Sequence, residues 1–252
     1  MGKSVIIIER SGPVAIFRFD KPPVNAIDLE LVEQCIAAIT GLASDPAVGA
    51  IVVTGAGRCF SAGLDLRTVP FYSAEQQRRM VLDINRAITL IYGLSMPVVA
   101  AINGHAVAGG FVMALANDYR IGTSAPCKLG LTESKLGIPF PVTTMELVKS
   151  ELAPAVARRL TLIGELLEPE EALREGILDE LAAPELLLPR ALQLATELAA
   201  VPRAGYAEIK RELRESALAR MEAAVTDEDD PMLAGWIGDE GRAATARLIE
   251  RL

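Results

Sequence analysis

The chain has 252 residues, of which 51% are hydrophobic and 23% charged, a composition typical of a globular protein with a large core and not of a disordered chain. Its 33 acidic residues outnumber its 25 Lys and Arg, giving a formal net charge of −8, which argues against a nucleic-acid partner. Cys35, Cys59 and Cys127 are widely spaced and His105 is the single histidine, so we expect no metal site and a reducing compartment, the cytoplasm.

The N-terminal half alternates predicted strands and helices. In chain order we expect strands at 5–9 and 14–19, a helix at 28–42, a strand at 50–54, a helix at 73–94, a strand at 98–102, a helix opening at Gly109 and a strand at 119–122. After about residue 145 the strand signals fade, and helices are expected at 145–152, 155–163, 169–175, 184–200, 205–221 and 239–252. The pattern predicts an α/β core followed by a helical C-terminal region.

One segment is long and apolar enough to require a membrane test. Ala87–Asn117 contains no Asp, Glu, Lys or Arg, but Pro97, Gly104 and the Gly109-Gly110 pair each interrupt a continuous helix. We therefore expect a buried strand, a turn and a helix rather than a membrane span. An uncharged segment of this kind is the deepest part of a core, where a desolvated site is expected.

Two glycine-containing motifs follow predicted strands. Gly55-Ala56-Gly57 resembles the start of a dinucleotide-binding turn, but Phe60 stands where the third glycine is required, which disfavours that interpretation. The Ser61-Ala62-Gly63 turn instead indicates a backbone N–H that faces a cleft. Gly109-Gly110 opens an apolar helix, where free N–H groups can stabilise a developing oxyanion by roughly 3 kcal/mol per donor. Close helix–strand packing explains the glycine pair equally well, and spacing alone leaves both explanations open.

Together these motifs resemble those of the crotonase (enoyl-CoA hydratase/isomerase) superfamily. The resemblance rests on Cys59-Phe60-Ser61-Ala62-Gly63-Leu64-Asp65-Leu66 and on Asn103-Gly104 through Gly109-Gly110 to Asp118-Tyr119-Arg120, and it extends over essentially the whole chain. It implies a crotonase-like ββα spiral core with the acyl-CoA site over residues 1–190. Residues 191–252 would form a helical region for oligomerisation, giving a homotrimer or a dimer of trimers.

The resemblance also implies the binding residues. Two backbone N–H groups, carried over to Ala62 and Gly109, would form an oxyanion hole for the thioester carbonyl of an acyl-CoA substrate. The other substrate-binding positions would be Gly63, Leu64, Asp65, Leu66, Arg67 and Thr132. Arg67 could bind a CoA phosphate or be a solvated surface charge. His105 is expected to be structural and Asp65 to be a turn residue. Coenzyme A enters as part of the substrate, and no further cofactor, nucleic acid or membrane is expected.

The acids decide between the reactions of this superfamily. Hydratases carry a glutamate three residues after the oxyanion glycine, where this chain has Val112, whereas Glu133 falls on the second family position. Hydration ordinarily uses two carboxylates, but one is sufficient to move a proton from C2 to C4. The pattern is similar to the Δ3,Δ2-enoyl-CoA isomerase branch, with Glu133 as the single catalytic base. Hydration, thioester hydrolysis or decarboxylation remain the alternatives among enzymes, and a CoA-binding subunit without turnover is the alternative outside them.

Overall fold

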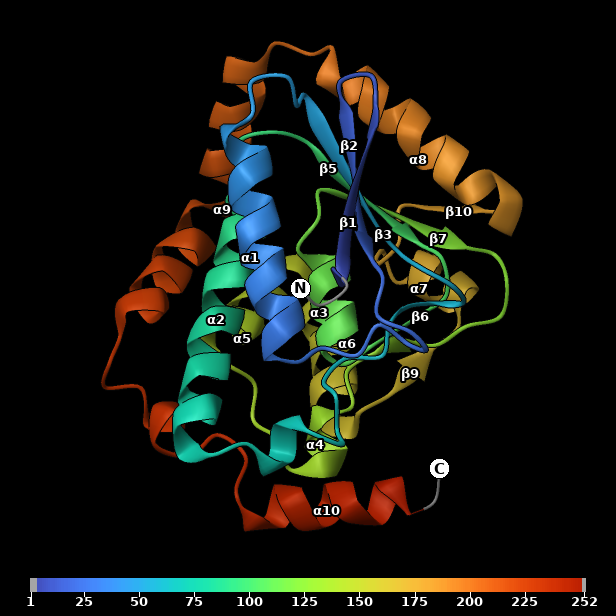
Figure 1. Cartoon of the computed structure of the whole chain (residues 1–252). Coiled ribbons are helices and arrows are strands. Elements are labelled where there is room, and N and C mark those ends of the chain that lie inside the picture. Colours follow the sequence, from blue (N-terminus) through green and yellow to red (C-terminus); the bar gives the residue numbers. More distant parts are fainter. Residues whose placement is uncertain (1–3, 251–252) are drawn as a thin grey trace.

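A computed structural model describes residues 4–250, which contain two β-sheets surrounded by helices (Figure 1). The larger sheet has six strands in the spatial order β1-β2-β3-β5-β7-β10. These strands are β1 Ile6–Ser11, β2 Val14–Phe19, β3 Ala50–Gly55, β5 Val98–Ile102, β7 Tyr119–Thr123 and β10 Glu180–Ala182. β1 pairs with β2 antiparallel through a tight turn, and the other pairs in this sheet are parallel.

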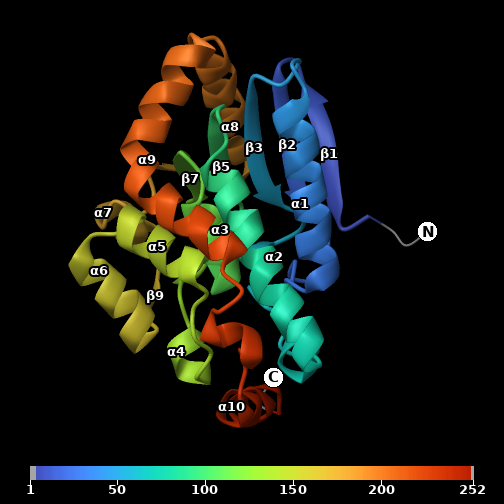
Figure 2. The ribbon, with the colours of Figure 1, turned by 90° about the vertical axis from the view of Figure 1, so that its left-hand side faces the viewer.

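Helices cover both faces of the larger sheet, which is why its central strands are continuous apolar runs. On one face, Val52 and Val99 contact the buried side of α8 (Pro184–Ala199) through Leu187, Ala191 and similar residues. The opposite face packs against α1 (Leu29–Ser44), α2 (Ala74–Tyr92) and α3 (Gly109–Leu115). Figure 2 shows α1 and α2 side by side. Asp28 caps α1, and Ser73 with Gln76 forms a capping box at α2, so both helices begin where their sequences predict.

The smaller sheet lies below the larger one and consists of short strands that the sequence analysis did not predict. Its order is β4-β6-β8-β9, with β4 Cys59–Ser61, β6 His105–Val107, β8 Leu129–Gly130 and β9 Leu166–Leu167. β6 leads directly into α3, and β8 leads into the short helix α4 (Glu133–Leu136). The smaller sheet therefore positions the two helices that begin at Gly109 and Glu133.

The remaining helices follow the predicted order with two corrections. They are α5 Val142–Glu151, α6 Pro154–Arg158, α7 Pro169–Arg174, α9 Arg203–Thr226 and α10 Asp239–Ile249. The helix expected at 155–163 is instead α6 followed by one wider, π-helical turn, Arg159–Ile163. Gly164 ends that turn in the left-handed region, at φ 67°. The expected loss of strands after residue 145 is wrong, because β9 and β10 lie there. The end of the helix expected at 239–252 reaches residues 251–252, outside the described residues.

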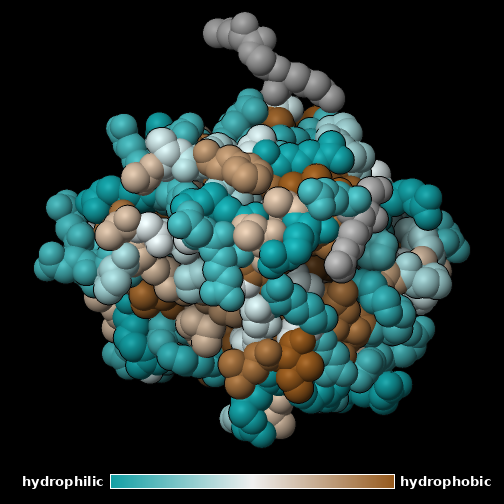
Figure 3. Space-filling model, turned by 90° about the horizontal axis from the view of Figure 1, so that it is seen from below, coloured by the Kyte–Doolittle hydropathy of each residue, from teal (hydrophilic) through white to brown (hydrophobic). Residues whose placement is uncertain are grey.

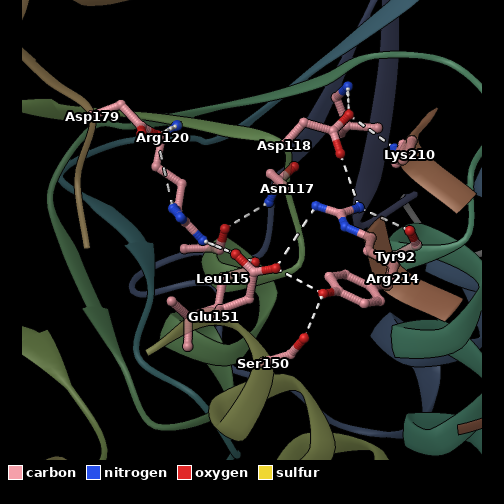
Figure 4. A network of polar contacts seen from close by, with 12 residues as sticks. Tyr92, Leu115, Asn117, Asp118, Arg120, Ser150, Glu151, Asp179, Lys210 and Arg214 are labelled. Carbon is pink, nitrogen blue, oxygen red and sulfur yellow. Dashed lines mark hydrogen bonds and ion pairs between the residues drawn. The ribbon is translucent and has the colours of Figure 1, made fainter. Parts of the chain in front are cut away.

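A buried polar network fixes α9 to the core (Figure 4). Asp118, just before β7, accepts hydrogen bonds from the Lys210 ammonium at 2.8 Å and pairs with the Arg214 guanidinium at 2.9 Å, both on α9. Arg214 also lies over the Tyr92 ring, 3.9 Å from its centre. Unlike isolated surface pairs, these charges are almost entirely buried, so each depends on its partners.

After α9 the chain crosses to the lower end of the molecule. It forms a 3₁₀ turn, η3 (Pro231–Ala234), that contacts α2, and then α10, which contacts α4. Figures 1 and 2 both show α10 below the rest of the fold. The predicted division at residue 190 stays a prediction, and the continuous helix α8 spans that position. Within residues 4–250, no helix is long and apolar enough to cross a membrane.

Candidate active site

An apolar pocket opens where the smaller sheet, α2, α3 and α4 meet. Its walls include Ile84 and Ile88 of α2, Val112 of α3, Phe140 and Trp236. Leu64, Gly109 and Glu133 also line it. Among the described residues around this pocket, Glu133 is the only one with an ionisable side chain. The structure thus brings together three residues that the sequence analysis singled out, from segments far apart in the chain.

Glu133 is the first residue of α4, and it lines the apolar pocket. The residue is 8% exposed, and its Oε2 atom is buried without a hydrogen-bond partner in the described part of the chain. Burial raises the pKa of Glu133 to about 7, while hydrogen bonding by the backbone of Glu133 and Thr132 acts in the opposite direction. A carboxyl group with that pKa can both take up and return a proton near neutral pH.

The start of α3 supplies a free backbone donor. Ala108 adopts φ 52° and ψ −128°, a conformation that residues with a Cβ rarely adopt, and its N–H donates to the Gly130 carbonyl at 2.8 Å. The next residue, Gly109, is the first of the helix, so its N–H has no acceptor one turn earlier. No acceptor for it lies elsewhere among residues 4–250. The Gly109 N–H is therefore unpaired in a residue that lines the pocket.

The second predicted donor, Ala62, requires a correction. The Ala62 N–H donates to the carbonyl of Val24 at 3.0 Å, so it is already occupied. Leu64, two residues later, is placed differently. The Ile27 N–H donates to the Gly63 carbonyl and the Asp65 N–H donates to the Ile27 carbonyl, at 2.8 Å each. Because the backbone groups of successive residues in an extended segment point to opposite sides, the Leu64 N–H points away from Ile27. Leu64 lines the pocket and its N–H has no partner among the described residues.

The sequence motif includes Leu64 as a binding position but does not mark its N–H as the free donor, because Gly63 at φ 82° interrupts strand alternation between Ala62 and Leu64. What the sequence could not show is which of these N–H groups pairs with the segment at residues 24–27. That partner lies nearly forty positions earlier in the chain, and its register is decided by the fold.

The other predicted binding residues surround the pocket without lining it. Gly63 adopts φ 82°, which favours glycine, and Asp65 accepts a hydrogen bond from the Arg67 N–H at 3.0 Å as a turn residue. Leu66 is half-buried, Arg67 is exposed, and Thr132 precedes α4. Their contact with a CoA moiety stays a prediction.

Neither His105 nor Val112 adds a second acid–base group to the pocket. The Nδ1 atom of His105 accepts a hydrogen bond from the Lys128 N–H at 3.0 Å, and the residue is exposed on β6, away from the pocket lining. Val112 is 3% exposed and lines the pocket. Its aliphatic side chain cannot transfer a proton.

Comparison with known proteins places this geometry in a family. The family model described as enoyl-CoA hydratase/isomerase matches residues 9–244. The chain belongs to the enoyl-CoA hydratase/isomerase family. Enoyl-CoA delta isomerase 1 of mouse mitochondria is 31% identical over 207 residues, covering 78% of this chain and 70% of that protein. Crotonyl-CoA hydratase of Syntrophomonas wolfei is 30% identical over 192 residues, covering 75% of this chain and 74% of that protein.

Solved structures agree with this family assignment. Human mitochondrial Δ3-Δ2-enoyl-CoA isomerase superposes with a TM-score of 0.88 over 98% of this chain and 97% of that chain, at 27% sequence identity. The expected crotonase fold, with its α/β core and helical C-terminal region, is therefore confirmed. The protein is an enzyme of the enoyl-CoA hydratase/isomerase family, whose named members include both hydratases and isomerases.

Proposed function

We propose that this family member is a Δ3,Δ2-enoyl-CoA isomerase that uses Glu133 as its single acid–base group. The observation that carries the proposal is the composition of the pocket. Glu133 is the only ionisable side chain among the described lining residues, and the position one helical turn into α3 holds Val112. A reaction that needs one carboxylate fits this pocket, and a reaction that needs two does not.

In the proposed reaction the thioester carbonyl lies between the N–H groups of Leu64 and Gly109. Glu133, ionised, removes a proton from C2 of a 3-enoyl-CoA, and the electrons move onto the carbonyl oxygen to form a dienolate. The two N–H groups stabilise that oxyanion, each contributing about 3 kcal/mol to the transition state. Protonated Glu133 then delivers the same proton to C4, which leaves the double bond between C2 and C3.

The apolar walls support both steps of this mechanism. Burial keeps the pKa of Glu133 close to 7, so neither protonation state is strongly favoured and the proton can move in both directions. The aliphatic side chains of Val112 and Ile88 also offer no hydrogen bond to a water molecule near C3. Without a positioned water, addition across the double bond is disfavoured and the proton shift remains.

The CoA moiety would extend from the pocket past the segment at residues 62–67. Arg67 is exposed beside it and carries a charge that could bind a CoA phosphate. We propose no cofactor beyond CoA itself.

Two further proposals concern the protein's setting. The three cysteines are free and buried, which supports a role in a reducing compartment such as the cytoplasm. Exposed apolar side chains support self-association as a trimer or a dimer of trimers, among them Leu162, Ile163 and Leu213. Figure 3 shows apolar patches between hydrophilic residues on the lower face. Light scattering on the purified protein measures its oligomeric state and tests this proposal.

The function is tested with two absorbance assays on the wild type and the Glu133→Gln variant. One assay follows the gain of conjugated enoyl thioester from trans-3-hexenoyl-CoA, and the other follows its loss from trans-2-hexenoyl-CoA in water. We expect gain without loss in the wild type and neither in the variant. Loss by hydration would identify a hydratase with a second acid, and silence in both assays with CoA still bound would favour other thioester chemistry or a binding subunit.

A further inference from the structure

Trp236 is the only tryptophan of the chain, and it lines the acyl pocket from an unexpected direction. It lies between η3 and α10, in the segment that follows α9. Of the described residues around the pocket, it alone comes from the part of the chain after α5. Its residue exposure of 3% shows that it is buried within its own chain.

Hydrogen bonds on both sides hold this indole in place. Its Nε1–H donates to the Pro139 carbonyl at 2.8 Å, and the N–H of the next residue, Ile237, donates to Oε1 of Gln77 at 2.8 Å. Gln77 is 4% exposed on α2 and donates in turn to the Tyr72 carbonyl at 3.2 Å. The ring is therefore fixed between α2 and the loop that carries Pro139 and Phe140, both of which line the pocket.

The surroundings of the ring define the chemistry of the ligand group that can reach it. Apart from Glu133 and Thr144, the described side chains that line the pocket with Trp236 are apolar, and the only N–H of the indole is already used by Pro139. A charged or hydroxylated group beside Trp236 would lose its water without gaining a partner. An uncharged hydrocarbon chain meets no such penalty.

We propose that Trp236 is the end wall of the acyl pocket and limits the length of the hydrocarbon chain that the enzyme accepts. The identity of the ligand as an acyl-CoA thioester rests on the proposed function. The placement of the wall rests on the pocket and its hydrogen bonds. Trp236 is thus a specificity-determining residue that the segment after α9 supplies to the pocket.

The first test compares kcat/KM for trans-3-hexenoyl-CoA and trans-3-dodecenoyl-CoA. In Trp236→Ala, we expect the ratio of the longer to the shorter substrate to rise about tenfold over the wild type, because removing the ring extends the apolar space. Trp236→Phe keeps an aromatic wall and should leave the ratio near that of the wild type. Leu233→Ala is the matched control, since Leu233 is buried in the same segment but does not line the pocket. An unchanged ratio in Trp236→Ala, or an equal rise in Leu233→Ala, would overturn the proposal.

The second test needs neither a variant nor turnover. Because Trp236 is the single tryptophan, its fluorescence reports contact with a ligand directly. We expect the unreactive hexanoyl-CoA, whose chain the wild-type pocket accepts, to change the emission of the wild type, and CoA alone to leave it unchanged. A response without isomerase activity would support the wall and reject the proposed function. Isomerase activity with emission indifferent to the acyl chain would reject the wall and leave the function standing.

Discussion

Gly63 and Gly109 lie so close that a Cβ atom on Gly63 would be 3.0 Å from the Gly109 nitrogen. The Leu64 nitrogen is likewise 4.0 Å from the place that a Cβ on Gly109 would occupy. Two chain segments that are far apart in the sequence therefore meet with bare backbone, and the N–H groups of Leu64 and Gly109 become neighbours. This contact is the structural basis of the proposed oxyanion hole.

The role of the Leu64 N–H can be tested by removing it. Leu64→Pro lacks this donor, and we expect kcat to fall by about a hundredfold, the usual effect of losing one oxyanion donor. Leu64→Ala keeps the N–H and should retain most of kcat. The comparison uses steady-state isomerase kinetics, with circular dichroism to show that both variants are folded. Equal activity in the two variants would show that the Leu64 N–H is not an oxyanion donor and that another group fills this role.

The raised pKa of Glu133 predicts a pH dependence of activity. Only ionised Glu133 can remove the C2 proton, so kcat/KM should rise about tenfold per pH unit below pH 7 and level off above it, since the pKa is about 7. The pH–rate profile of the free enzyme measures this directly. A profile with its midpoint near 4.5, the ordinary value for Glu, would show that the carboxylate is solvated rather than desolvated.

The same pKa predicts the sign of a change in stability. Folded protein holds the Glu133 proton more tightly than unfolded protein, so this group stabilises the fold fully below pH 4.5. That contribution declines as the pH rises toward 7, by at most about 3 kcal/mol. Urea unfolding across this range should show that Glu133→Gln loses less stability than the wild type. Parallel curves would contradict the assignment.

Val112→Glu tests whether one missing acid separates this enzyme from a hydratase. The variant places a second carboxyl group in the pocket, and we expect measurable hydration of trans-2-hexenoyl-CoA together with reduced isomerase activity. Val112→Gln has the same size without the charge and serves as the control. If both variants hydrate the substrate equally, a second acid at this position is not what hydration requires.

Asp118 offers a test of the buried network that anchors α9. It accepts from Lys210 at 2.8 Å and pairs with Arg214 at 2.9 Å, and both cations are almost fully buried. Asp118→Asn removes the anion that Lys210 and Arg214 share and leaves Arg214 only its longer pair with Glu151 at 3.9 Å, so we expect a loss of about 3 kcal/mol in the free energy of unfolding. Glu208→Gln removes an exposed ion pair with Arg211 and should cost less than about 1 kcal/mol. Equal losses in urea unfolding would contradict the role of the network.

The long elements of this fold were predictable because each carries its own signal. Ala50–Gly55 and Val98–Ile102 are continuous apolar runs, and α2 combines a capping box with helical spacing. The strands β4, β6 and β8 have three residues or fewer, too few to show a period. β10 (Glu180–Ala182) is an edge strand of intermediate burial, so no apolar run marks it.

Two residues of the candidate site could be singled out from the sequence, and their proposed roles stay predictions. Gly109 and Glu133 follow from motifs, and the structure brings both to the same pocket. Ala62 was wrong because the choice between it and Leu64 depends on the hydrogen bond from Ala62 to Val24, a pairing decided by tertiary structure. The contact of Trp236 with Pro139 likewise spans almost a hundred residues of the chain. Local patterns carry no information on such a distance.

The most direct test of the account is to follow the proton itself. A 3-enoyl-CoA that carries deuterium at C2 is converted in ordinary water during single turnovers, and the product is analysed by mass spectrometry and NMR. If Glu133 removes and returns the proton within a pocket closed to water, a substantial share of the deuterium should appear at C4. If C4 receives only solvent protons while the label is lost to water from the first turnover, Glu133 does not keep the proton it removes, and the account of a single base in a pocket closed to water is contradicted.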